Sequence, residues 1–375
     1  MRKMILGALV GALFAVSAAP LEIISPKEGA TVPILTADMK AYLAQPRAER
    51  VKQFADPAER KRIAKFGDCP QKTLLSWTCT VPVSTGTVWN VKVRRAKDGA
   101  VVFTAKTSKN SVEIDNLEIA CDYKWRVKGV AGDGAPLRAG GTFRTEDMAP
   151  RLIHLSRVRN MRDLGGRVGL GGRRVRQGRV YRSAGLNTNA RKSKSKGGMV
   201  PGKETLTDAS RAYAKGRLGI RTDLDLRSDR ECFGMTGSPL GPEVKWIQAS
   251  SSAYGGMAKD SSKKAFAKEF RVFLDEKNYP IVFHCIAGAD RTGSLAFILN
   301  GLLGVDEEEL WRDWEVTAFQ KEKVDFGHRT RFNKLVKVFD AFPGANIHEK
   351  IGAYVKSAGF TDADIEKFRA LMLEP

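Results

Sequence analysis

One cysteine and one arginine stand in a segment that could carry nucleophilic chemistry. The segment reads IVFHCIAGADRTGSLAFILN and contains Cys285 and Arg291. The apolar run that ends at His284 predicts a buried strand, and the run Leu295–Leu299 predicts a helix. A thiolate at the strand end could attack a bound tetrahedral oxyanion while the guanidinium fork holds its oxygens. The pattern therefore predicts a strand, a tight loop and a helix built around covalent catalysis.

The residues between this strand and this helix are small enough for the backbone to form an anion nest. The candidates for binding through this loop are Ile286, Ala287, Gly288 and Ala289. Small residues let several N–H groups point to one centre, and the positive end of the following helix adds to the same field. This field should lower the pKa of Cys285, so that the thiol exists largely as thiolate.

The segment His284-Cys285-x5-Arg291-Thr292-Gly293 resembles the signature of cysteine-dependent protein tyrosine phosphatases. Three further segments match the bacterial and fungal branch whose loop reads HCxxGKDRTG, in the same order: Asn160 to Gly166, Tyr181 to Ser183, and Asp225 to Glu231. Taken by itself, the loop has three alternative interpretations: Cys285 could be a structural cysteine, or the loop could belong to a sulfurtransferase or an arsenate reductase. The ordered matches over roughly residues 155–375 favour the phosphatase branch, similar to tyrosine phosphatase family 3. One departure is Ala289, where the branch usually has a lysine.

The resemblance implies two-step phosphoryl transfer without a metal or another cofactor. Cys285 would be the nucleophile, and Arg291 would hold the phosphate. Thr292 would donate a hydrogen bond to the sulfur, and His284 would orient the loop. Alternatively, His284 is a buried histidine whose hydrogen bonds serve the core alone. The general acid implied is Asp290, although this residue could instead form a salt bridge with a neighbouring arginine. Asp223, Asp225 and Asp229 are the alternative candidates for the acid. The remaining substrate-binding candidates are Arg162, Asp163 and Arg227, the last of which could equally form a structural ion pair.

The chain has 375 residues and a formal net charge of +21, which favours anionic partners. Residues 1–19 resemble a signal peptide, with Arg2 and Lys3 before an apolar core and a small-residue cleavage site. We therefore expect export to a periplasmic or extracellular location, with no transmembrane segment beyond the signal peptide. An exported chain can form disulfides, so pairing among Cys69, Cys79, Cys121 and Cys232 stays open.

Short alternating segments with turn dipeptides between them predict a β-sandwich over residues 20–146. Its aromatics Trp77, Tyr123 and Trp125 resemble the core of fibronectin type III domains. The charged, alanine-rich stretch at about 37–66 predicts a helical insertion in this sandwich. A linker at 147–154 then leads to an α/β catalytic domain at 155–375, with a central, mainly parallel sheet flanked by helices. We expect this domain to fold by itself from about Arg151.

The expected partner is a phosphorylated, anionic substrate. We expect first a phosphotyrosine protein as the substrate, hydrolysed by an enzyme of the dual-specificity type. The alternative substrate is an inositol phosphate such as phytate, or a phosphoinositide. A secreted protein that only recognises phosphate is the alternative from another class. The basic loop Arg191–Gly198 has no interleaved aromatic residues, so we expect no nucleic acid as a partner. The four histidines have no metal-ligand spacing, so we expect no metal site.

Overall fold

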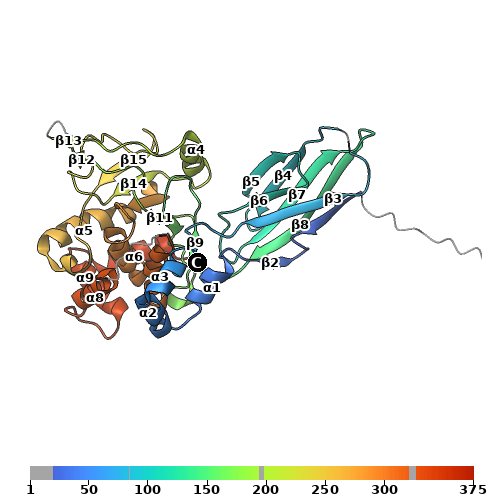
Figure 1. Cartoon of the computed structure of the whole chain (residues 1–375). Helices are drawn as coiled ribbons and strands as arrows, with labels where there is room; N and C mark the ends of the chain where they lie inside the picture. The colour runs from blue at the N-terminus through green and yellow to red at the C-terminus, as the bar shows by residue number, and fades with distance from the viewer. Residues whose placement is uncertain (1–19, 84, 194–197, 321–326) are drawn as a thin grey trace, which may run out of the picture. The chain divides into compact units, whose positions relative to one another are not determined.

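A computed structural model describes residues 20–83, 85–193, 198–320 and 327–375. The predicted signal peptide and positions 194–197 of the basic loop lie outside these ranges. The chain forms two compact units (Figure 1). The first unit comprises Met1–Ala30, Leu74–Val112 and Tyr123–Phe143, and the second comprises Thr31–Thr73, Glu113–Asp122 and Arg144–Pro375.

The first unit is built on a three-stranded sheet of order β1-β3-β6 and a five-stranded sheet of order β2-β8-β7-β4-β5. The strands are β1 Leu21–Ser25, β2 Ala30–Val32, β3 Thr73–Cys79, β4 Trp89–Arg95, β5 Val101–Thr107, β6 Ser111–Ile114, β7 Asp122–Val130 and β8 Pro136–Thr145. Alternate residues of β4 and β7 are buried, as expected for strands with one solvated face. The ring of Trp77 on β3 lies 5.8 Å from Trp89 and 6.4 Å from Trp125, so aromatic side chains join the two sheets.

The second unit holds a six-stranded sheet of order β15-β14-β16-β11-β10-β9. Strands β15, β14, β16 and β11 run parallel to one another, and β10 pairs antiparallel with β11 and β9. This confirms the expected mainly parallel sheet. The strands are β9 Arg151–Leu152, β10 Arg162–Asp163, β11 Val180–Ser183, β14 Thr222–Asp225, β15 Lys245–Gln248 and β16 Ile281–His284, and a hairpin adds β12 Arg191–Lys192 and β13 Met199–Val200.

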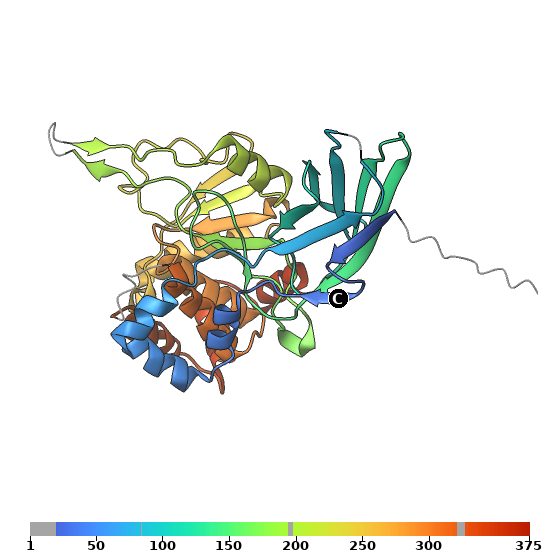
Figure 2. The ribbon, with the colours of Figure 1, turned by 45° about the vertical axis from the view of Figure 1, so that its right-hand side comes forward.

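Helices cover both faces of this sheet, so the central strand β16 is buried throughout. Figures 1 and 2 show α4 on one side and α5, α6, α8 and α9 on the other. The side chain of Val282 packs in the core beneath α4, whereas Ile281 and Phe283 pack in the core beneath the larger helical layer. The helix on the smaller side is α4 Asp208–Gly216. The remaining helices that follow β9 in the chain are α5 Asp260–Phe273, α6 Arg291–Leu302, α7 Glu307–Glu315, α8 Gly327–Phe339, α9 Ile347–Ser357 and α10 Asp362–Met372, with short 3-10 turns η1 Leu170–Gly172, η2 Tyr254–Ala258, η3 Glu276–Asn278 and η4 Val316–Gln320.

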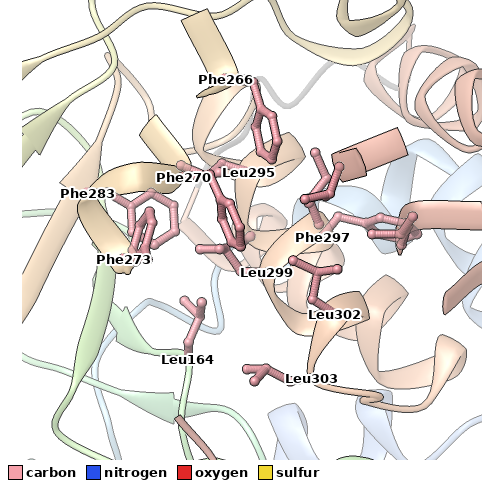
Figure 3. Packing of buried hydrophobic residues seen from close by; sticks show 14 of the residues in the cluster. Leu164, Phe266, Phe270, Phe273, Phe283, Leu295, Phe297, Leu299, Leu302 and Leu303 are labelled. Carbon is pink, nitrogen blue, oxygen red and sulfur yellow. The ribbon is translucent and has the colours of Figure 1, made fainter. Parts of the chain in front are cut away.

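Helix α6 lies in the middle of the larger core. Every residue from Thr292 to Leu302 is buried, and the helix is apolar on all sides, as a central helix requires. Figure 3 shows Leu295 and Leu299 of α6 beside Phe270 of α5. The start of α6 is therefore fixed by packing around its whole circumference.

The helical segment near the N-terminus belongs to the second unit, which corrects the predicted insertion in the sandwich. It forms α1 Ala37–Leu43, α2 Arg47–Ala55 and α3 Pro57–Ile63. Arg50 is fully buried, and its Nε lies 2.6 Å from Oε2 of Glu315 on α7. The guanidinium of Arg47 lies 3.4 Å from the centre of the Trp311 ring on the same helix. Composition predicted the helices, but their partners lie about 265 residues along the chain and left no local sign.

Two further observations concern the cysteines and the helices. All five cysteines lie within the described ranges and none is in a disulfide, so the pairing left open by the sequence is not formed. Across the described parts of the chain, no helix is both long and apolar enough to cross a membrane.

Candidate active site

The predicted strand, loop and helix are confirmed. Strand β16 ends at His284, α6 begins at Arg291, and Cys285 opens the loop between them with 2% of its surface exposed. Gly288 has a φ of +67°, and a Cβ there would lie 2.5 Å from the carbonyl oxygen of Ser183. Glycine is therefore required at this point of the loop, both for its backbone conformation and for its close approach to β11.

Three consecutive carbonyl groups of the loop, at positions 286–288, are held from outside the loop. They accept hydrogen bonds from the backbone N–H of Gly185 (3.1 Å), the side-chain amide of Asn160 (3.0 Å) and Nη2 of Arg182 (2.6 Å). In a trans peptide the N–H of the next residue points opposite to the carbonyl. The N–H groups of residues 287–289 are thereby directed to the other side of the loop. This arrangement supplies the expected anion nest.

The nucleophile candidate Cys285 has a pKa below its ordinary value. Burial opposes ionisation of the thiol, but hydrogen bonds from the side chain and backbone of Thr292 and the charge of Arg291 outweigh it. Thr292 is itself fully buried in the first turn of α6. Thr292 and Arg291 therefore both favour the thiolate form of Cys285.

The guanidinium of Arg291 is oriented by a carboxylate that the sequence motif contains. Its Nη1 lies 2.7 Å from Oε2 of Glu231, its Nη2 lies 3.0 Å from Oε1, and Nη1 also donates to the carbonyl of Leu226. Glu231 accepts two further bonds from the backbone and hydroxyl of Ser228. Burial raises the pKa of Glu231, but these bonds lower it overall, so the carboxylate is held ionised. The sequence placed Glu231 in a matched segment but assigned it no role.

Tyr254 is a member of the site that sequence reasoning missed. Its hydroxyl donates to Oδ1 of Asp290 over 2.6 Å, and its backbone N–H donates to Oγ of Ser294 over 3.0 Å. Burial raises the pKa of the Tyr254 phenol, so it remains a donor. The residue follows β15 in a turn where its φ is +55°, and no local pattern marks it. Asp290, our first choice of general acid, is therefore oriented by a tyrosine from the neighbouring strand connection.

His284 lies behind the loop between two aspartates. Its Nε2 lies 3.0 Å from Oδ1 of Asp223, and its Nδ1 lies 3.3 Å from the Cys285 carbonyl and 3.8 Å from Oδ1 of Asp225. Burial lowers the pKa of the imidazole, but the carboxylates of Asp225 and Asp223 outweigh burial and raise the pKa above its ordinary value, which favours the protonated form. The contact with the Cys285 carbonyl supports the expected orienting role.

The same cluster engages two of the three alternates for the general acid, Asp223 and Asp225. Asp223 is fully buried against His284 and the hydroxyl of Ser238. Burial raises the pKa of Asp225, but His284 and Arg227 together hold it well below its usual range. A carboxyl held ionised in this way has no proton to give. Asp229 is exposed in a turn after β14.

Three residues predicted to bind substrate are instead in buried ion pairs. Arg227 is fully buried and bidentate to Asp225, with Nη2 2.7 Å from Oδ2. Asp163 is fully buried against Arg151 and accepts backbone N–H groups from Gly165 and Gly178. Arg162 is fully buried and donates through Nε to Asp313 over 3.0 Å. These side chains support the site and do not face a substrate, which corrects the prediction for Arg162 and Asp163 and selects the ion-pair alternative for Arg227.

Asp313 on α7 is the centre of the largest charge cluster in the site. Arg162, Arg167 and Arg182 all donate to its carboxylate. Burial raises the pKa of Asp313, but the three guanidinium groups hold it well below its usual range. Because Arg182 also donates to the carbonyl of Gly288, the cluster connects α7 directly to the loop. No motif of the sequence pointed to Asp313.

Comparisons with known proteins relate the chain to tyrosine phosphatases. Residues 153–196 and 202–374 match the family described as tyrosine phosphatase family. A Cupriavidus necator protein described as a candidate tyrosine-protein phosphatase is 30% identical over 180 residues, covering 41% of this chain and 58% of the relative. A tyrosine-protein phosphatase of Nostoc commune is 28% identical over 138 residues, covering 31% of this chain and 46% of the relative. The chain thus spans about half the length of these curated relatives.

Among solved structures, the core catalytic domain of the PP-IP phosphatase SIW14 from S. cerevisiae is similar with 17% identity and a TM-score of 0.28. That match covers 41% of this chain and 79% of the other.

Proposed function

Since the chain belongs to the tyrosine phosphatase family, we propose that it hydrolyses phosphate monoesters through a phosphocysteine intermediate on Cys285. The observation that carries the proposal is the loop itself. Three of its carbonyl groups are tied outward, which directs the N–H groups at 287–289 to one side. The thiol of Cys285 at the start of this loop has a lowered pKa. A nucleophile and an oxyanion cradle are therefore built into one short segment.

In the first step, the Cys285 thiolate attacks phosphorus and the bond from phosphorus to the ester oxygen breaks. The N–H groups of the loop and the guanidinium of Arg291 stabilise the equatorial oxygens, where charge gathers in the transition state. Asp290 gives its proton to the leaving oxygen and is left ionised, accepting the hydrogen bond from Tyr254. In the second step, water attacks phosphorus, Asp290 takes up a proton, and the thiolate leaves with a hydrogen bond from Thr292.

We propose phosphotyrosine as the first substrate class. The side chain of Ile286 follows the nucleophile directly and is 44% exposed, which offers an apolar contact to an aromatic leaving group. Ala289 stands where related loops carry a lysine, so the rim has one cation fewer for a multiply phosphorylated ring. The net charge of +21 favours an inositol phosphate or phosphoinositide as the second candidate.

Turnover of p-nitrophenyl phosphate in the presence of a chelator tests the reaction. Cys285→Ser should abolish turnover, and Cys79→Ser, which changes a cysteine in β3 of the first unit, is the matched control. A phosphorylated protein trapped by rapid acid quenching should form with the native chain and not with Cys285→Ser. Turnover that survives in Cys285→Ser would refute the mechanism, and a chain without any turnover would leave phosphate recognition as its role.

A panel of four substrates separates the substrate classes. Its members are a phosphotyrosine peptide, a phosphoserine peptide, a phosphoinositide and phytate. The proposal expects the highest kcat/KM for the phosphotyrosine peptide. A higher value for phytate or the phosphoinositide would transfer the assignment to the second candidate, and comparable values for both peptides would indicate dual specificity.

We also retain two proposals on organisation. The two sheets and the cluster of Trp77, Trp89 and Trp125 support a fibronectin III-like sandwich in the first unit. The basic start and apolar core of residues 1–19 support export. Fractionation of cells that express the full chain, with N-terminal sequencing of the mature protein, tests the export proposal.

A further inference from the structure

The outer face of the five-stranded sheet in the first unit is strongly basic. We call it the cationic face, and it consists of Lys92, Arg94, Lys106, Lys124, Arg126 and Lys128. These side chains come from β4, β5 and β7, point away from the core and line a groove of about 610 Å³. None of the described residues that line the groove is acidic.

Basic side chains stand directly opposite one another on this face. In the register of β4 and β7, Lys92 faces Arg126 and Arg94 faces Lys124. Like charges at facing positions destabilise a sheet, so this arrangement costs folding free energy. Elsewhere in the same unit, basic residues have acidic partners, such as Arg95 with Asp98. The cationic face therefore has a charge pattern that an external anion would complement.

The spacing of the charges favours an extended anionic surface over a single small anion. Neighbouring strands lie about 4.8 Å apart, and every second residue of a strand is about 6.8 Å further along, so the face extends over about 14 Å from Lys124 to Lys128. This is within about two Debye lengths at physiological salt, so the potentials of the six cations overlap. Trp125, the aromatic residue among those that line the groove, is only 3% exposed and packs in the core. A face without exposed rings has no platform on which unpaired bases could stack.

We propose that the cationic face docks on the surface of an acidic lipid bilayer. Each basic side chain near such a surface contributes about 1 kcal/mol, which is a factor of about five in the partition coefficient. Six of them together are enough for reversible binding without an inserted segment. The proposal concerns the first unit and does not depend on the proposed phosphatase reaction.

Co-sedimentation of the full chain with vesicles tests the proposal. Vesicles of phosphatidylcholine alone are compared with vesicles that also contain phosphatidylglycerol, at low and at high salt. We expect binding only with phosphatidylglycerol, and release by salt. The double change Lys92→Gln and Arg126→Gln should lower the partition coefficient about 30-fold. Because it also removes a repulsive cross-strand pair, its thermal midpoint should not fall.

The matched control is the double change Lys27→Gln and Lys109→Gln. It removes the same charge from turns that do not line the groove, and should lower the partition coefficient by no more than about twofold. Equal losses in both double variants, or no dependence on phosphatidylglycerol, would overturn the proposal. Binding of a single-stranded oligonucleotide without any binding to vesicles would also overturn it and assign a nucleic acid to the face. Turnover of a soluble aryl phosphate, measured in parallel, should be equal in all variants.

Discussion

Replacing Arg50 by methionine should destabilise the second unit by about 3–5 kcal/mol. The side chain of Arg50 is fully buried, with Nε 2.6 Å from Glu315 and Nη1 2.6 Å from Glu308. Glu315 is only 1% exposed, so its carboxylate cannot regain water when the guanidinium is removed. Glu308 is 32% exposed and can be solvated, so the pair with Glu315 accounts for most of the expected loss.

A second variant and a double variant isolate this contribution. Arg47→Met is the matched control, because Arg47 lies on the same helix, pairs with the half-exposed Glu307 and stacks on Trp311, and should cost about 1–2 kcal/mol. Adding Glu315→Gln to Arg50→Met removes the buried charge as well. The double variant should therefore recover a substantial part of the stability lost in Arg50→Met.

Urea unfolding of the full chain provides the measurement, with turnover of p-nitrophenyl phosphate identifying the transition of the second unit. A loss in Arg50→Met no larger than in Arg47→Met would refute the reasoning. A fragment that begins at Arg151 lacks α1–α3 and should be unstable or inactive, which reverses our expectation from the sequence. A stable, active fragment would show that the N-terminal helices are dispensable.

Three further predictions concern the loop and its support. Arg291→Lys should lower kcat by about 100-fold, because lysine lacks the fork, and a near-native kcat would assign Arg291 to folding alone. Asp290→Asn should slow phenyl phosphate by about 100-fold and barely slow an aryl phosphate with a strongly acidic phenol; equal losses would make Asp290 structural. Burial raises the pKa of Glu269 from its ordinary value of 4.5 to about 7, against the hydrogen bonds from Ser251. Its contribution to stability is therefore fully present below pH 4.5 and is lost as the pH rises through about 7, by at most about 3 kcal/mol. Glu269→Gln should flatten this decline in urea unfolding measured at several pH values, and an unchanged decline would contradict the assignment.

The chemistry of the loop could be predicted because its determinants are adjacent in the chain. The strand before Cys285, the small residues after it and the helix from Arg291 are all local patterns, and the structure confirms each of them. Gly288 illustrates the same point, since a loop that curls around an anion needs a residue with positive φ.

The orientation of the surrounding charges could not be predicted in this way. Whether Arg162 faces a substrate or a carboxylate depends on Asp313, which lies 151 positions further along the chain. The same holds for Tyr254 and Asp290, which meet across 36 positions through a turn that has no sequence signature. A basic residue in a matched segment is compatible with both roles, and only tertiary packing selects one of them.

The long separation between Arg50 and Glu315 has a consequence for the time course of biosynthesis. At about 5–20 residues per second, the ribosome adds the 265 residues between them in about 13–50 s. During this interval the N-terminal helices have already been made, but the carboxylate that pairs with Arg50 has not. The same helix α7 carries Asp313, whose partner Arg182 donates to the carbonyl of Gly288 in the loop after Cys285. The nascent chain can therefore complete its active site only after α7 has emerged, so α2 and α7 must pair late.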